Sequence, residues 1–213
     1  MECLYLPELA DDDKKAVITG DEAKHCKALR LSREDRIFIS NGKGYRATGR
    51  LINFDKKNYE FQIINGENNP GELPFRLALA IGLLDDKGRF EFALEKATEL
   101  GVHEIIPFKS DFSQNSKLRS NRSAAKLIAA MKQCRRSVLP QLHKLADFND
   151  IFEIMKGSLF IACDIEGEKP GLPRKIRDVT NIIGPEGGFS DSELQVLENK
   201  CRIWKLSDIR LRS

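Results

Sequence analysis

The architecture of this 213-residue chain is decided by the stretch Ile182-Ile183-Gly184-Pro185-Glu186-Gly187-Gly188-Phe189-Ser190. It follows a short apolar segment, Val179–Ile183, of the kind that forms buried parallel strands. It leads into Ser190-Asp191-Ser192-Glu193, a capping box that opens a helix. Ligands of open α/β sheets bind beyond the carboxyl ends of strands, and glycines let a ligand approach backbone groups closely. The stretch is therefore either a ligand loop or a tight turn, and its spacing favours neither. It lacks the lysine of a phosphate-binding P-loop.

Working outward, the second half of the chain alternates between strand-like and helix-like segments. Phe75–Leu83 is a nearly continuous apolar run, and Phe90–Leu100 reads as a helix that ends at Gly101. Further segments of the same two kinds are Val102–Pro107, Ser120–Arg136, Leu159–Cys163 and Arg202–Leu206. This alternation predicts an α/β layer with a parallel sheet.

The first 70 or so residues have a different pattern. Strands are expected at Arg36–Ser40, Tyr45–Phe54 and Asn58–Ile64, after a short helix at about Asp21–Arg30. Such spacing favours a small barrel or sandwich. The pattern Gly42-Lys43-Gly44-Tyr45-Arg46-Ala47 precedes a strand rather than a helix, so we interpret it as a hairpin turn and not a dinucleotide site.

Asn65–Gly71 consists almost entirely of turn-forming residues. We place the domain boundary there, which gives an N-terminal domain at 1–70 and a C-terminal domain at 71–213.

Composition restricts the class of protein. Lys and Arg number 35 against 32 Asp and Glu, a net charge of +3 that excludes a histone-like polycation but not a nucleic-acid binder. The five cysteines and three histidines are scattered, which suggests neither disulfides nor a metal site. No apolar run reaches the roughly 18 residues of a membrane span, and Met1–Ala10 lacks a basic signal region. We expect a reduced, cytoplasmic, metal-free protein.

Basic residues are concentrated in one window. Between Asp111 and Ala146 there are eight basic residues and one acidic residue. This imbalance favours binding of RNA or DNA, although a solvated helix face would produce a similar run. A second basic group at near-helical spacing consists of Lys24, Lys27, Arg30 and Arg33. These side chains either contact phosphates or are ordinary surface charges. The candidate RNA-binding residues are Lys24, Lys27, Arg30, Arg33, Arg119, Arg122, Lys132, Arg135 and Arg136.

Three separated motifs then converge on one family. They are Glu95-Lys96-Ala97-Thr98-Glu99-Leu100-Gly101-Val102, the stretch Ile183–Ser190, and Leu206-Ser207-Asp208-Ile209-Arg210-Leu211-Arg212-Ser213. In this order and spacing the chain resembles the 16S ribosomal RNA uracil-N3 methyltransferases of the SPOUT superfamily. Gln133-Cys134-Arg135-Arg136 followed by Pro140 is similar to another segment of that family.

The resemblance implies a PUA-like small β-barrel that binds RNA, followed by a SPOUT α/β domain with a parallel sheet and a deep trefoil knot. It implies a homodimer that acts on 16S rRNA of the small ribosomal subunit. S-adenosylmethionine would be held in the knot, mainly by backbone groups. The cofactor-binding residues implied in this way are Ile161, Cys163, Ile183, Gly184, Pro185, Glu186, Gly187, Gly188, Leu206, Ser207 and Leu211.

The chain departs from the family at a few positions. Ser207 and Arg135 stand where glycine is common, and Lys132 stands where glutamate is common. The family continues past the match at Arg212-Ser213 into a final helix that threads the knot. We expect that helix to follow Ser213 in the full protein.

Methyl transfer to N3 of uracil requires loss of the imide proton and stabilisation of charge on the neighbouring carbonyl oxygens. Arg136 and Arg212 are the candidates for stabilising charge, with phosphate binding or structural pairing as alternatives. Glu186 is a candidate base, or a residue that orients the loop through backbone N–H groups near a helix start. Two other functions remain open: a SPOUT enzyme for another RNA position, and a non-catalytic RNA-binding or ribosome-assembly protein.

Overall fold

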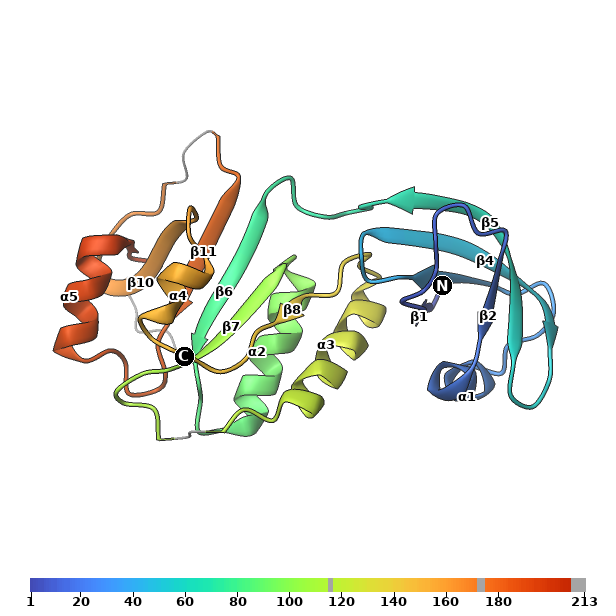
Figure 1. The fold of residues 1–213 in the computed structure, drawn as a ribbon, viewed down its shortest axis with the longest axis horizontal. Helices are drawn as coiled ribbons and strands as arrows, with labels where there is room; N and C mark the ends of the chain where they lie inside the picture. Colours follow the sequence, from blue (N-terminus) through green and yellow to red (C-terminus); the bar gives the residue numbers. More distant parts are fainter. Residues whose placement is uncertain (115–116, 172–174, 208–213) are drawn as a thin grey trace. The chain divides into compact units, whose positions relative to one another are not determined.

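A computed structural model describes residues 1–114, 117–171 and 175–207 (Figure 1). The chain divides into two compact units: unit 1 holds residues 1–72 and 127–139, and unit 2 holds residues 73–126 and 140–213. The first boundary lies two residues beyond the expected one. The inclusion of residues 127–139 in unit 1 differs from the expected division at 70/71. The reason is that one helix, α3 (Ser120–Cys134), begins in one unit and ends in the other.

Unit 1 contains a five-stranded mixed sheet in the order β1-β3-β4-β5-β2. Strand β1 pairs parallel to β3, and the other neighbours are antiparallel. Its elements are β1 (Cys3–Tyr5), β2 (Lys15–Ile18), α1 (Gly20–Ala28), β3 (Arg36–Ser40), β4 (Tyr45–Phe54) and β5 (Tyr59–Asn68). The strands expected at Arg36–Ser40 and Tyr45–Phe54 are confirmed, whereas β1 and β2 escaped the sequence analysis because they are short.

The interpretation of Asn65–Gly71 as a linker is wrong for its first half. Residues 65–68 continue β5, and Asn65 and Asn68 pair with Thr48 and Tyr45 of β4. Their side chains are exposed, so the backbone ladder holds the strand without apolar residues. The turn itself begins at Asn69, where φ is 51°, and includes Gly71, where φ is 76°.

The predicted hairpin between β3 and β4 is confirmed. Gly42 and Gly44 have φ angles of 70° and 108°, which glycine adopts without steric cost. Strands β3 and β4 lie antiparallel on either side of it. The core of unit 1 is closed by fully buried side chains, the largest of which are Leu4, Ile18, Ile37, Ile39, Leu51 and Phe61.

Unit 2 contains a seven-stranded parallel sheet with helices between its strands. The strand order is β12-β10-β11-β6-β7-β8, and β9 pairs with β7. Figure 1 shows β11, β6 and β7 in this order. Apart from α3, the elements are β6 (Arg76–Gly82), α2 (Lys87–Glu99), β7 (Glu104–Lys109), β8 (Gln141–Leu142), β9 (Ala146–Asp147), α4 (Asp150–Ile154), β10 (Leu159–Glu168), β11 (Asp178–Ile183), α5 (Asp191–Lys200) and β12 (Arg202–Trp204). The predicted parallel α/β sheet is confirmed. The short elements β8, β9 and α4 were not foreseen.

Helix ends in unit 2 follow their local signals. Helix α2 begins at Lys87 because Asp86 accepts hydrogen bonds from the backbone N–H groups of Gly88 and Arg89, at 2.7 and 3.2 Å. It ends before Gly101, whose φ of 90° matches the predicted C-terminal glycine. The capping box at Ser190 is present in both directions with Glu193.

The expected trefoil knot depends on residues near the C-terminus, and residues 208–213 lie outside those described. The knot therefore stays a prediction. None of the helices among the described residues is long and apolar enough to span a lipid bilayer.

Candidate functional site at the carboxyl edge of the parallel sheet

The glycine-rich loop lies against the end of a neighbouring strand. It leaves β11 after Ile183, and β11 pairs with β6, which ends at Gly82. A Cβ atom placed on Gly82 would lie 2.5 Å from the backbone nitrogen of Pro185. Only glycine at position 82 lets the loop cross this close to the end of β6.

Within the loop, hydrogen bonds fix a defined turn. The N–H of Gly188 donates to the carbonyl of Pro185 at 2.9 Å, and Gly188 has a φ of 76°. The exposed Glu186 accepts a hydrogen bond from the N–H of Asp85 at 3.3 Å, which supports its loop-orienting interpretation. A Cβ atom on Gly188 would meet nothing within 4 Å. The space beside its Cα is therefore free of the described residues, while its N–H is bonded to Pro185 and its carbonyl accepts from Ser110 Oγ at 3.5 Å.

The other expected cofactor segments follow adjacent strands. Strand β10 pairs with β11 on one side and with β12 on the other, where Cys163 is opposite Trp204. The side chain of Ile161 is only 1% exposed, so this residue can offer a ligand no more than its backbone. Burial raises the pKa of the Cys163 thiol, which makes it a poor nucleophile. Leu206, 56% exposed, and Ser207 come directly after β12.

A cavity of about 490 Å³ opens beside β10 and β12. It is lined by Gly167, Glu168, Lys169, Gly171 and Cys201–Trp204. Leu211 and Arg212, the remaining candidates of this region, lie outside the described residues.

A turn that the sequence analysis missed is attached to the same loop. Residues 110–113 follow β7, and the buried carboxylate of Glu193 holds them. Ser110 Oγ donates to Glu193 Oε2 at 2.8 Å, and the N–H of Asp111 donates to Oε1 at 3.1 Å. Ser190 Oγ donates to Asp111 Oδ2 at 2.6 Å. The turn after β7 and the start of α5 therefore form one hydrogen-bonded assembly at the sheet edge.

More of the cations in the basic window, residues 111–146, have acidic partners than the sequence suggests. Acidic residues from outside the window meet it: Arg122 donates to Glu91 at 3.1 Å, and Lys126 to Glu95 at 3.3 Å. Lys132 donates to Glu22 at 2.6 Å. Counting acids only within the window was misleading, because the fold brings glutamates from α1 and α2 to these cations. Arg119 and Arg135 are exposed.

Arg136 is buried with a carboxylate partner in unit 1. Its guanidinium contacts Glu72, with Nη2 at 2.6 Å from Oε2, and the two side chains are 8% and 5% exposed. Glu72 also accepts from the N–H groups of Ser137 and Val138, both at 3.1 Å. This geometry favours the structural-pairing alternative for Arg136 over a role in stabilising charge on the substrate.

Comparison with known proteins identifies the family. The family model of the RNA methyltransferase domain matches residues 71–213, and that of the RNA methyltransferase PUA domain matches residues 18–64. The chain belongs to this RNA methyltransferase family. The predicted combination of a PUA-like N-terminal domain with a parallel α/β methyltransferase domain is thereby confirmed.

Relatives and solved structures agree. The methyltransferase is 29% identical to the ribosomal RNA small subunit methyltransferase E of Mesomycoplasma hyopneumoniae, over 85% of this chain and 81% of that protein. It is 27% identical to the protein of the same name from Bacillus subtilis, over 84% of this chain and 77% of that protein. The crystal structure of the Neisseria gonorrhoeae protein of that name, bound to S-adenosyl methionine, matches with a TM-score of 0.88 and 25% identity, covering 100% of this chain and 91% of the other.

The PUA-like unit of the methyltransferase presents the second group of basic candidates. Lys24, Lys27, Arg30 and Arg33 are all at least partly exposed. Lys24 forms an ion pair with Asp21 at 2.6 Å between two exposed side chains, a contact that water and salt screen. All four charges are accessible to a polyanion.

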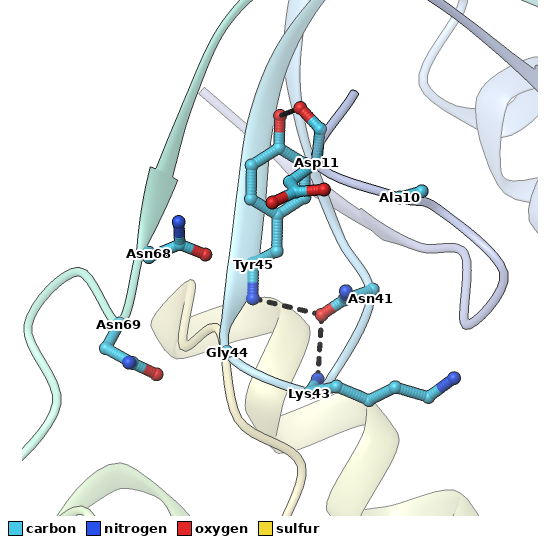
Figure 2. Close-up of a pocket in the computed structure, with 8 residues that line it drawn as sticks. All are labelled: Ala10, Asp11, Asn41, Lys43, Gly44, Tyr45, Asn68 and Asn69. Carbon is cyan, nitrogen blue, oxygen red and sulfur yellow. Dashed lines mark hydrogen bonds between the residues drawn. The ribbon is translucent and has the colours of Figure 1, made fainter. Parts of the chain in front are cut away.

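A polar pocket of about 280 Å³ also lies in this unit, beside the β3–β4 hairpin. Asn41 Oδ1 accepts from the N–H groups of Lys43 and Tyr45, at 2.8 and 3.0 Å, as the dashed lines in Figure 2 show. The pocket is lined by Ala10, Asp11, Asn41, Lys43, Gly44, Tyr45, Asn68 and Asn69 (Figure 2). With amide, hydroxyl and carboxylate groups in its wall, it offers both donors and acceptors to a polar ligand.

One further motif and one histidine singled out in the sequence form local hydrogen bonds in unit 2. The motif Glu95–Val102 forms the end of α2, where Thr98 Oγ1 donates to the carbonyl of Leu94 at 2.8 Å. His103 accepts a hydrogen bond from the N–H of Leu77 at 3.3 Å. Among the described residues, no group of three His, Cys, Asp or Glu side chains is arranged to hold a metal ion.

Proposed function

We propose that this methyltransferase transfers the methyl group of S-adenosylmethionine to N3 of a uridine in 16S ribosomal RNA of the small subunit. The observation that carries the proposal is the loop Gly184–Gly188, which follows β11 and crosses the end of β6 so closely that only glycine fits at position 82. The name that its relatives share, ribosomal RNA small subunit methyltransferase E, supports the substrate. The cofactor is supported by the S-adenosyl methionine in the Neisseria gonorrhoeae structure.

When bound, S-adenosylmethionine supplies an electrophilic methyl group. The loop Gly184–Gly188 and the segments that follow β10 and β12 would hold this donor, mainly through backbone groups. Exposed Glu186 orients the loop through the N–H of Asp85 and remains the candidate base. The charge that develops on the uracil oxygens is assigned to Arg212, because Arg136 is engaged by Glu72.

The protein acts in the cytoplasm as a homodimer. Lys24, Lys27, Arg30 and Arg33 of the PUA-like unit contact RNA phosphates, and Arg119 and Arg135 add to this contact. Neutralising phosphates makes binding fall steeply with salt concentration, so RNA affinity should drop on raising the salt.

The test uses the full-length protein, tritiated S-adenosylmethionine and small ribosomal subunits that lack base methylation. After digestion to nucleosides, mass spectrometry should identify labelled 3-methyluridine. Another labelled nucleoside would move the target atom and keep the enzyme class. Absence of transfer by a protein that binds the RNA would favour a non-catalytic RNA-binding protein.

Arg136→Lys tests whether Arg136 stabilises charge on the substrate or only pairs with Glu72. Lysine keeps the charge beside Glu72 but lacks the forked guanidinium. We expect kcat at saturating RNA to change less than about 3-fold, because Arg136 contacts Glu72 rather than the substrate, whereas the melting temperature should fall with the loss of the fork. A loss of a hundred-fold or more with an unchanged melting temperature would return Arg136 to the catalytic group.

A further inference from the structure

An exposed aromatic side chain stands on the turn that follows β7. Phe112 is 52% exposed, although the backbone on both sides of it is fixed. The N–H of Ser113 donates to the carbonyl of Ser110 at 2.9 Å, and the N–H of Ser110 donates to Ser113 Oγ at 3.1 Å. Together with the bonds from this turn to Glu193, these contacts hold Phe112 in place without covering its ring.

Phe112 lies directly against the glycine-rich loop. A Cβ atom placed on Gly187 would be 2.9 Å from the Cβ of Phe112, closer than two such carbons approach in proteins. Glycine at position 187 is what lets the aromatic residue stand here. The two loops therefore fit one another, and about half of the surface of Phe112 stays exposed.

Sheet order separates Phe112 from the other cofactor segments. Those segments follow β10 and β12, whereas Phe112 follows β7, and β11 and β6 lie in between. At about 4.8 Å per strand, β7 and β10 are some 14 Å apart. The turn that carries Phe112 is therefore at the β7 side of the glycine-rich loop, and the segments expected to hold the adenosine are at its β10 side. Methyl transfer requires donor and acceptor to be held in line, so an acceptor base would enter from the β7 side.

The surroundings of Phe112 suit RNA. Lys109, at the end of β7, is exposed, and so is Arg119 farther along the same connection. The carboxylate of Asp111 accepts hydrogen bonds from Ser190 and Ser192, at 2.6 and 3.4 Å, which reduces its repulsion of phosphates. Proteins stack unpaired bases on aromatic rings that occur among basic residues, and here Lys109 precedes Phe112 by three positions in the chain.

We propose that Phe112 is a stacking platform for an unstacked base of the RNA substrate, positioned at the acceptor side of the glycine-rich loop. This inference rests on the proposed function and adds a residue that sets the position of the base. Enzymes that modify a base must expose it from its stack, and a fixed aromatic face compensates for part of the lost stacking.

Four variants test the platform: Phe112→Ala, Phe112→Leu, Phe112→Tyr and the matched control Phe92→Ala. Phe92 is 60% exposed on α2, under Lys96, and so controls for loss of an exposed ring. For each variant we would measure the Kd for S-adenosylmethionine, the Kd for small ribosomal subunits without turnover, the methylation KM and kcat, and the melting temperature.

We expect Phe112→Ala to weaken RNA binding and raise KM about ten-fold, with an unchanged Kd for S-adenosylmethionine. Phe112→Leu should resemble Phe112→Ala, because size without a π-face does not stack, whereas Phe112→Tyr should retain wild-type values. Phe92→Ala should leave all of these quantities unchanged.

Two results would overturn the platform: RNA binding that Phe112→Ala and Phe92→Ala affect equally, or a Kd for S-adenosylmethionine that rises in Phe112→Ala. The second would make Phe112 a cover for the cofactor. RNA affinity is measured without turnover, so both results keep their meaning even if the wild-type protein forms no 3-methyluridine. That failure would count against the proposed reaction alone.

Discussion

Each unit of the molecule contains a buried glutamate that organises a loop, but the two glutamates have different partners. Glu72 in unit 1 accepts from Arg136 and from the backbone of residues 137 and 138. Glu193 in unit 2, 5% exposed, accepts from Ser110, Asp111 and Ser190, none of which is a cation. The first carboxylate is neutralised by an opposite charge and the second by hydrogen-bond donors at a helix start. The difference teaches that a buried carboxylate needs donors in every case, and a cation only where no helix N-terminus is available.

The largest effect is expected from Glu72→Gln. This change leaves the buried guanidinium of Arg136 without its counter-charge, which typically costs about 3–5 kcal/mol. Urea denaturation followed by circular dichroism would measure the free energy of unfolding. Glu67→Gln is the control, because Glu67 is 59% exposed and its pair with Arg46 should contribute less than about 1 kcal/mol.

The double variant Glu72→Gln/Arg136→Met sharpens this first result. If the unpaired guanidinium of Arg136 causes most of the stability loss in Glu72→Gln, the double variant should be more stable than Glu72→Gln alone. Additive losses would contradict the charge-pair account and leave only packing and hydrogen bonds to explain the effect.

The acid side of the stability profile tests the same carboxylate. Burial raises the pKa of Glu72, but the hydrogen bond and charge of Arg136 and the bonds from Val138 and Ser137 lower it more, so its pKa lies below the ordinary value. The contribution is therefore complete above the pKa of the unfolded chain and is lost as the pH falls through the lower folded pKa. Wild-type stability should decline on acidification more steeply than that of Glu72→Gln, as chemical denaturation across the acid range would show. Parallel curves would mean that Glu72 does not contribute through its charge.

Sequence-based prediction succeeded for one of the two glutamates. Ser190 and Glu193 are three residues apart, and their capping box was predicted because both partners lie in one helical turn. Glu72 and Arg136 are separated by 64 residues, and no local pattern indicates their pairing. The same limitation made the basic window look unpaired.

The fold was predictable wherever a local period or turn signal dominates, as in Tyr45–Phe54 and at Gly101. The strand at residues 65–68 was not predictable, because its polar residues are held only by the ladder with β4. In the candidate site, the glycine-rich loop could be found from its composition. The turn at residues 110–113 could not be found in this way. Its hydrogen bonds to Glu193 come from Ser110 and Asp111, which precede Glu193 by 83 and 82 positions in the chain.

A smaller effect is expected from Glu193→Gln. The glutamine side chain keeps one acceptor oxygen, but its NH2 group faces protein groups that are themselves donors. No cation among the described partners of Glu193 loses a counter-charge. We expect a loss of about 1–2 kcal/mol in the free energy of unfolding. Amide hydrogen exchange should accelerate at Asp111 or at Ser190, which bond to different oxygens of Glu193, according to which of the two then faces the amide nitrogen. The exposed Glu198 provides the control, and a loss as large as that of Glu72→Gln would erase the distinction between the two carboxylates.

The smallest effect on the free energy of unfolding is expected from Ser190→Ala. Combined with Glu193→Gln, this variant distinguishes two roles of Glu193, as part of the helix cap and as the group that holds the turn at residues 110–113. Ser190 Oγ accepts from the N–H of Glu193 at 3.3 Å and also donates to Asp111 at 2.6 Å. Removing an N-cap hydroxyl costs about 1 kcal/mol. If Glu193 acts mainly as part of the helix cap, its replacement should add little once Ser190 is gone, and the double variant should fall short of the sum. If Glu193 acts mainly by holding the turn at residues 110–113, the stability losses of Ser190→Ala and Glu193→Gln should add. Phe112 would then be positioned by a carboxylate on α5 rather than by the hydrogen bonds of its own turn.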